Sequence, residues 1–276
     1  MKTAYKASCF VVFIVFALEL ILVVAASAET VPSPLPTEAG QETRTADKTG
    51  TDPSNFQRTL SLSNEYIAFA HGGAYLNTTT LTYFEPINHG RARFSLELPF
   101  AGTDVTGQTD TGLADLTMRY GQILYLDRSK AFAAGLGLVA PTATADALGA
   151  GKWSFEPSAS VILFLSQEWI VAPSFKQTVS FAGDSKRADV NLSTCDLYVV
   201  WRSRSLKEWV ILDPAFAWNW EKDRDQLIGI TTLTYGHLLG RAGNGVWSGY
   251  VKPGIGWGNG RSSDWSIEAG LKVVGF

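Results

Sequence analysis

Hydrophobic and polar residues alternate along most of the chain from residue 56 to its C-terminus. The run RARFSLEL at residues 91–98 places apolar side chains at even positions and arginine, serine and glutamate at odd positions. The runs at 153–165 and 265–273 alternate in the same way, and a helical period is hard to find anywhere. A period of two is typical of β-strands with two different faces, so the pattern predicts an all-β fold.

Such runs follow one another along the chain, separated by clusters of glycine, asparagine, aspartate and serine. They lie near 58–69, 74–86, 90–100, 111–126, 130–141, 152–166, 168–182, 187–202, 207–220, 225–239, 246–258 and 264–276. An even number of strands with mostly short connections is what an up-and-down closed sheet requires.

Two all-β folds fit this pattern, a transmembrane barrel and a soluble sandwich, because the strands of a sandwich also alternate. Many of the runs reach the length that a bilayer-crossing strand needs, whereas strands of soluble proteins are commonly shorter. All nine tryptophans fall at or beyond Trp153, several of them at the ends of runs, where an aromatic girdle forms. We therefore predict an all-β, transmembrane up-and-down antiparallel β-barrel of about 12 strands. A soluble, sugar-binding sandwich is the main alternative.

The polar faces of several runs carry charged residues, as the watery lumen of a barrel permits. The candidate lumen-lining residues are Arg91, Arg93, Glu97, Asp115, Arg119, Glu156 and Lys176. Two interpretations of this mixed-charge cluster stay open. One is a constriction that orients polar or anionic solutes, and the other is a set of cross-strand salt bridges that fills a narrow barrel.

The N-terminus has the three parts of a secretory signal peptide. Lys2 and Lys6 supply the positive head, an apolar stretch follows, and an A-x-A motif of small residues ends at Ala28. Glu19 within the apolar stretch argues against a permanent transmembrane anchor, because a charge at mid-bilayer is costly. The pattern predicts a signal peptide at 1–28 that is cleaved after Ala28.

The next segment, residues 29–55, is rich in proline, threonine, glutamate and aspartate and has almost no large apolar residues. Such a composition predicts a disordered leader, followed by a single barrel domain at 56–276. Cys9 lies in the signal peptide, so the mature chain keeps only Cys195 and has no internal disulfide. The exported chain is therefore expected to gain its stability without disulfide bonds.

The sequence contains few features that would indicate a catalytic site, a metal site or a cofactor site. The formal net charge of −3 argues against nucleic acid as a partner. The three histidines, His71, His89 and His237, lack the His-x-Ser spacing that would place a base and a nucleophile on one side of a strand. No cysteine or histidine cluster suggests a metal ion. We expect no catalytic residue, no metal and no cofactor.

The chain ends on an apolar aromatic residue, Phe276, directly after a strand-like run. Bacterial outer-membrane barrels commonly end in this way, and the terminal aromatic residue resembles the signal read by their assembly machinery. In this sequence the apolar face of the last run lies on odd positions, so only a bulge near Gly275 would bring Phe276 into phase with it. We predict that the assembly machinery recognises the chain through Phe276.

Three stretches resemble a known family: TGLADLTMRY (111–120), GLGLVAPTA (135–143) and LGAGKWSFEPSASVILF (148–164). In this order and spacing they resemble the outer-membrane family labelled "MetA-pathway of phenol degradation", whose members are often described as transporters. The residues that match the family pattern well are Gly149, Gly151, Trp153 and Pro157, and the sequence departs from it at Ala114 and Ala143. The resemblance implies an outer-membrane barrel.

These features together predict a channel of the Gram-negative outer membrane for the passive passage of small molecules, hydrophobic or aromatic ones among them. Its expected partners are outer-membrane lipid, small-molecule solutes and the barrel-assembly machinery. A non-conducting barrel with a structural or adhesive role is the first alternative. An outer-membrane lipid hydrolase is a weaker one.

Overall fold

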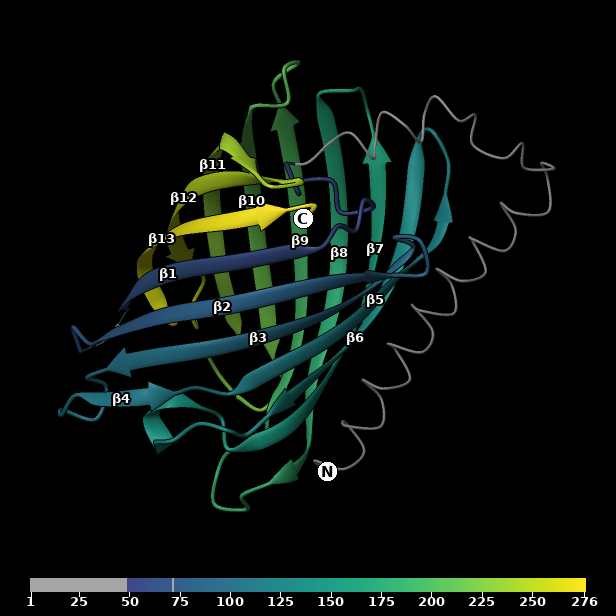
Figure 1. The fold of residues 1–276 in the computed structure, drawn as a ribbon. Coiled ribbons are helices and arrows are strands. Elements are labelled where there is room, and N and C mark those ends of the chain that lie inside the picture. Colours follow the sequence, from purple (N-terminus) through teal and green to yellow (C-terminus); the bar gives the residue numbers. More distant parts are fainter. Residues whose placement is uncertain (1–48, 71) are drawn as a thin grey trace, which may run out of the picture. The chain divides into compact units, whose positions relative to one another are not determined.

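The computed structural model describes residues 49–70 and 72–276, which form one closed antiparallel barrel (Figure 1). The strands are β1 (Thr59–Phe69), β2 (Tyr75–Ile87), β3 (Ala92–Thr103), β4 (Asp110–Leu113), β5 (Leu116–Leu126), β6 (Lys130–Ala140), β7 (Lys152–Phe164), β8 (Trp169–Gly183), β9 (Asn191–Arg202), β10 (Glu208–Asn219), β11 (Leu227–Ala242), β12 (Gly245–Trp257) and β13 (Ser263–Val274). Apart from β4, each strand pairs with the strands next to it in the chain, and β1 pairs with β13 to close the sheet. The short β4 pairs with β3 only, and β3 pairs directly with β5. Without the short β4, twelve strands of the described chain make the barrel, so the predicted fold class is confirmed.

One predicted strand, at 111–126, is wrong because the structure divides it into β4 and β5. The break falls at Asp115, whose carboxylate accepts hydrogen bonds from the backbone N–H groups of Ala143 (3.2 Å) and Ala150 (2.7 Å). These bonds hold the connection between β6 and β7 against the barrel rim. The alternation of side chains continues across the break, and so the sequence pattern does not reveal it.

The two ends of the barrel differ in the length of their connections. At the end where β1 begins and β13 finishes, the turns are short, and the turn between β11 and β12 consists of residues 243–244. At the opposite end the connection from β6 to β7 spans residues 141–151 and includes the 3-10 helix η1 (Asp146–Leu148). We refer to these as the short-turn end and the long-loop end. Short periplasmic turns and longer extracellular loops are typical of outer-membrane barrels.

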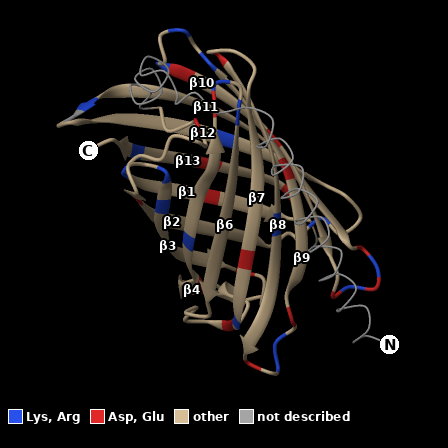
Figure 2. Ribbon diagram, turned by 90° about the vertical axis from the view of Figure 1, so that its right-hand side faces the viewer, with Lys and Arg blue, Asp and Glu red and all other residues tan. Residues whose placement is uncertain are grey.

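The outer face of the barrel is apolar and the inner face is polar, which inverts the usual arrangement of a soluble protein. On β1, Leu60 and Leu62 point outward and are 42% and 53% exposed, while Ser61 and Ser63 line the lumen. Acidic and basic residues occupy only a few positions of each strand, and the rest of the strand is uncharged (Figure 2). A continuous apolar belt on the outside is typical of strands that face hydrocarbon. Within residues 49–70 and 72–276, no helix is long and apolar enough to cross a membrane.

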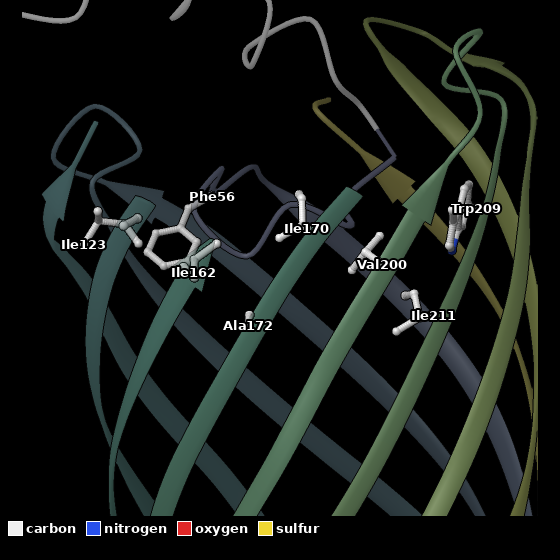
Figure 3. Close-up of a cluster of buried hydrophobic side chains, with 9 residues drawn as sticks. Phe56, Ile123, Ile162, Ile170, Ala172, Val200, Trp209 and Ile211 are labelled. Carbon is white, nitrogen blue, oxygen red and sulfur yellow. The ribbon is translucent and has the colours of Figure 1, made fainter. Parts of the chain in front are cut away.

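The hydrophobic core is a layer of inward-pointing side chains at the short-turn end of the lumen (Figure 3). It consists of Phe56, Ile123, Ala131, Ile162, Ile170, Ala172, Val200, Trp209 and Ile211. All but Phe56 come from the strand ends nearest the short turns. The layer narrows the lumen there, because its side chains point into the barrel from several strands.

Residues 49–57, which we call the N-terminal segment, lie inside this end of the barrel. Thr49, Thr51 and Ser54 are all less than 7% exposed, and Phe56 joins the apolar layer. This differs from the disordered leader predicted up to residue 55. The segment is polar, but its buried side chains hydrogen-bond to one another: the Thr49 and Thr51 hydroxyls are 2.7 Å apart, and the Ser54 N–H and hydroxyl donate to the Asp52 carboxylate at 2.9 and 2.7 Å. With Phe56 in the apolar layer, its order does not require many large apolar residues. The predicted signal peptide and the leader up to residue 48 lie outside the described residues.

The turn between β5 and β6 is organised by one carboxylate, Asp127. Its oxygens accept hydrogen bonds from the Ser129 N–H (2.7 Å), the Lys130 N–H (2.8 Å) and the Tyr125 hydroxyl (2.7 Å). Partial burial by itself would raise the pKa of Asp127, but the hydrogen bonds from Tyr125 and from the backbone outweigh it and lower that pKa to about 2. The charged form of Asp127 therefore stabilises the folded turn.

Replacing this carboxylate should destabilise the barrel in a pH-dependent way. We expect Asp127→Ala to lower the free energy of unfolding by about 1 kcal/mol at pH 7. Because the folded pKa is depressed, this difference should be complete above about pH 4 and should disappear as the pH falls towards 2. Urea unfolding at several pH values, followed by tryptophan fluorescence, measures it, with Asp223→Ala in an exposed loop as the control. A difference that is independent of pH would contradict the assignment.

Candidate functional site

The lumen contains a cavity of about 370 Å³ next to the N-terminal segment. Its wall is formed by β1 to β3 and β9 to β13, and Gly50 and Gln57 of the N-terminal segment also line it. The charged and aromatic side chains of the wall are Arg93, Lys252, Lys272, Glu97, Asp213, Glu268, Phe84, Tyr198, Trp209 and Tyr250. A concave site that combines aromatic surface with a few charged groups is typical of small-molecule binding.

Arg93 on β3 lies over two aromatic rings. Its Cζ atom lies 4.7 Å from the ring centroid of Phe56 and 5.0 Å from that of Phe84, distances at which a cation is attracted to the ring face. Its side chain remains open to the lumen. Within residues 49–70 and 72–276, no carboxylate forms an ion pair with Arg93, and its described close contacts include these two rings.

Two aromatic side chains of the wall are positioned by glycines on the neighbouring strand. Trp209 lies opposite Gly236 in the β10–β11 register, and a Cβ atom at 236 would stand 2.1 Å from the indole ring. Tyr250 lies opposite Gly270, where a Cβ would stand 2.5 Å from the phenol ring. Each ring therefore lies flat over a glycine, and this keeps the lumen open beside it.

A second charged group of the lumen is a chain of ion pairs across four strands. Glu97 of β3 pairs with Arg119 of β5, whose guanidinium also reaches Glu156 of β7 at 2.9 Å. Glu156 in turn lies 3.4 Å from the Lys176 ammonium of β8 and accepts a hydrogen bond from Thr178 at 3.1 Å. Glu156 is the most enclosed member, because only 7% of its side chain is exposed. It therefore connects two cations that would otherwise repel each other.

The strand between Arg119 and Glu156 has a glycine at the crossing point. A Cβ atom at Gly137 of β6 would stand 2.9 Å from the Cβ of Glu156 and 3.4 Å from the Cγ of Arg119. A side chain there would separate the two charged residues. The glycine in the GLGL stretch of the sequence thus has a physical role in the ion-pair chain.

On the opposite wall, Lys252 of β12 pairs with Glu268 of β13, which also accepts a hydrogen bond from the Tyr250 hydroxyl. Nearby, Asp213 of β10 has one carboxylate oxygen enclosed in the wall with no hydrogen-bond partner. None of these residues was among the seven lumen-lining candidates predicted from the sequence. Both Lys252 and Glu268 stand on the polar face of alternating runs, and that signal was available.

The structure distributes the seven sequence-selected residues over four places. Glu97, Arg119, Glu156 and Lys176 form the ion-pair chain, and Arg93 stands beside it in the cavity. Arg91 lies exposed in the turn between β2 and β3, and Asp115 lies at the rim with its hydrogen bonds to the backbone.

The histidines lie away from the lumen cavity where they are described. The Nδ1 atom of His237 on β11 is 3.7 Å from the Glu208 carboxylate, and both side chains are almost half exposed. His89 lies in the turn between β2 and β3, and His71 is outside the described residues. In the described part of the chain, no group of three or more histidine, cysteine or acidic residues is arranged to hold a metal ion.

No protein-family model matches the sequence, and no curated protein sequence matches it. Solved structures do resemble the fold. An outer membrane channel from Pseudomonas putida F1 superposes with a TM-score of 0.65 at 13% identity, over 83% of this chain and 99% of that one. The NanC porin gives 0.56 at 13% identity over 79% and 99%, and the KdgM porin gives 0.52 at 8% over 78% and 98%. At these identities the likeness shows the barrel fold of outer-membrane porins and channels.

Proposed function

We propose that the protein is an outer-membrane channel through which small molecules pass passively along the lumen. The observation that carries the proposal is the inverted polarity of the barrel, with an apolar belt outside and charged and polar side chains inside. The channel and porin folds it resembles support the same function. The difference between the two ends supports an orientation with the short turns and both ends of the barrel domain in the periplasm.

The proposal includes the finer predictions from the sequence. Residues 1–28 act as a signal peptide cleaved after Ala28, outer-membrane lipid surrounds the apolar belt, and Phe276 is read by the barrel-assembly machinery. The backbone turns at Gly275 with φ +71°, and the Phe276 side chain is 42% exposed, which supports its recognition by a partner. The proposed family remains the one labelled "MetA-pathway of phenol degradation". The positions of Gly137 and Asp115 within its motif stretches support the assignment, since both hold the barrel wall together.

The residues that line the lumen favour the passage of solutes with charged or aromatic groups over that of purely aliphatic ones. Arg93 and the ion-pair chain present charges to the lumen, and four aromatic residues line the cavity. The KdgM porin has been solved in complex with a disordered oligogalacturonate, so a barrel of this fold accommodates an acidic solute. We propose that the charged lumen selects among small solutes in this chain as well.

Single-channel conductance in a planar bilayer tests the proposed function. The mature chain, residues 29–276, is first refolded in detergent, and a shift of its gel mobility on boiling shows that the barrel has formed. We expect discrete current steps in KCl, and we expect Arg93→Glu to shift the reversal potential towards cation selectivity, because it reverses an unpaired charge in the lumen. Arg224→Glu, in the exposed loop between β10 and β11, is the matched control.

A folded barrel that conducts no current would sink the channel proposal. The remaining hypothesis would then be a non-conducting barrel with a structural or adhesive role. Lipid hydrolysis by the same preparation that is lost in His237→Ala would point instead to the hydrolase.

A further inference from the structure

We infer that the lumen cavity binds small aromatic carboxylates, and that Arg93 binds the carboxylate group. The inference rests on the proposed channel function and names the class of solute. Benzoate is the simplest member of this class. Three features of the cavity support it: the state of the Arg93 guanidinium, the aromatic surface around it and the balance of the other charges.

The guanidinium of Arg93 contacts two aromatic rings and keeps its hydrogen-bond donors free of described protein groups. Phe56 and Phe84 contact it through their rings, which takes up ring-face interactions and no hydrogen-bond donors. The N–H groups of a guanidinium lie in its plane and match the two oxygens of a carboxylate. In residues 49–70 and 72–276 these donors make no hydrogen bond or ion pair with a protein group. They are therefore available to a ligand in the lumen.

The surface around Arg93 suits an aromatic ring. Phe84, Tyr198 and Tyr250 line the same cavity, and Tyr250 is flattened over Gly270. Trp209 also belongs to the wall, but it is only 1% exposed, so the other three rings offer the contact surface. Offset or edge-to-face contacts with such rings stabilise a bound aromatic group beyond simple burial. The volume of about 370 Å³ lies at the small end of the range for ligand pockets, which fits a one-ring molecule.

The remaining charges of the cavity favour an anion over a cation. Glu97 is paired with Arg119, and Glu268 is paired with Lys252. Asp213 also lines the cavity and contributes one negative charge to its wall, and one of its carboxylate oxygens is enclosed there without a hydrogen-bond partner. Lys272 also lines the cavity, and its ammonium lies 5.0 Å from the ring centroid of Trp209. Within residues 49–70 and 72–276, Arg93 is a cation of the cavity whose donors make no hydrogen bond or ion pair, so it is the group that a carboxylate would bind. A neutral aromatic molecule would use the rings and leave this charge unused.

Equilibrium binding tests the inference on the folded mature chain in detergent. Isothermal titration compares sodium benzoate with benzyl alcohol, which lacks the charge, and with sodium acetate, which lacks the ring. We expect benzoate to bind at least about tenfold more tightly than either. Arg93→Gln should weaken benzoate binding by about tenfold or more and leave benzyl alcohol unchanged, and Arg93→Lys should have an intermediate effect.

Two further variants separate a specific carboxylate site from a general charge effect. Lys176→Gln removes a cation that lies outside the cavity and is paired with Glu156, and benzoate affinity should stay within about twofold. Asp213→Asn removes a negative charge from the wall and should leave benzoate binding equal or tighter. Equal affinity of the wild-type chain and Arg93→Gln for benzoate would overturn the inference, as would equal binding of benzoate and benzyl alcohol.

The outcome is distinct from that of the conductance experiment. Current steps without benzoate binding would keep the channel and remove the aromatic-acid site. Benzoate binding that depends on Arg93 in a barrel without current would support the site and remove the passive channel.

Discussion

Removing the N-terminal segment is expected to raise the single-channel conductance severalfold. Thr49, Thr51 and Ser54 are buried inside the barrel, and Phe56 packs in the apolar layer that narrows the short-turn end. A shorter chain that begins at Arg58 lacks this segment and retains every strand of the barrel. Conductance of the two chains in the same KCl solution, each checked for its gel mobility shift, gives the comparison.

A deletion of residues 29–47 is the matched control, because it shortens the chain and leaves the N-terminal segment in place. Its conductance should equal that of the mature chain. Phe56→Ala should have an intermediate effect, since it removes one side chain from the apolar layer and one of the two rings beside Arg93. Unchanged conductance in the chain that begins at Arg58 would mean that the segment does not limit the current.

The alternating pattern predicts this fold well because each strand of a barrel separates two different environments along its whole length. The large apolar residues of 91–98 and 265–271 are exposed on the barrel, and the closed sheet has the strand number expected from the runs. The pattern is local, however. It cannot detect the break at Asp115, where two backbone N–H groups from residues far along the chain compete with strand pairing.

Long-range closure explains most of what the sequence analysis missed in the lumen. The pairing of β1 with β13 brings β12 and β13 beside the first strands, and only then do Lys252 and Glu268 face the same cavity as Arg93. The N-terminal segment was missed for a different reason. Its composition lacks large apolar residues, and its burial depends on an enclosure that the rest of the chain provides.

The two interpretations of the charged cluster, constriction and structural filling, need not exclude each other. The chain from Glu97 to Lys176 is paired throughout, as structural filling requires, whereas Arg93 is left with rings in place of a carboxylate. The same lumen therefore contains a paired region beside β6 and, in the cavity, the Arg93 guanidinium, which has no ion-pair partner within residues 49–70 and 72–276. Substitutions in the paired region should change both stability and ion selectivity, whereas substitutions of Arg93 should change mainly ion selectivity.

Glu156→Gln is expected both to destabilise the barrel and to make the channel more selective for anions. The carboxylate joins Arg119 and Lys176, and only 7% of it is exposed. Without its charge the two cations repel each other in the lumen, and the free energy of unfolding should fall by about 2 kcal/mol. The lumen also gains one positive charge, so the reversal potential should move in the direction opposite to that of Arg93→Glu.

The surface pair of Glu168 with Arg204 provides the control for stability. These groups lie 2.6 Å apart, but the Arg204 side chain is 91% exposed, so Glu168→Gln should change the free energy of unfolding by less than about 1 kcal/mol. Adding Lys176→Gln to Glu156→Gln should restore the charge balance of the lumen and return the reversal potential towards that of the wild-type chain. Urea unfolding and bilayer recordings measure the two effects separately. If Glu156→Gln were as stable as Glu168→Gln and still shifted the selectivity, the ion-pair chain would act on the solute path and contribute little to holding the wall together.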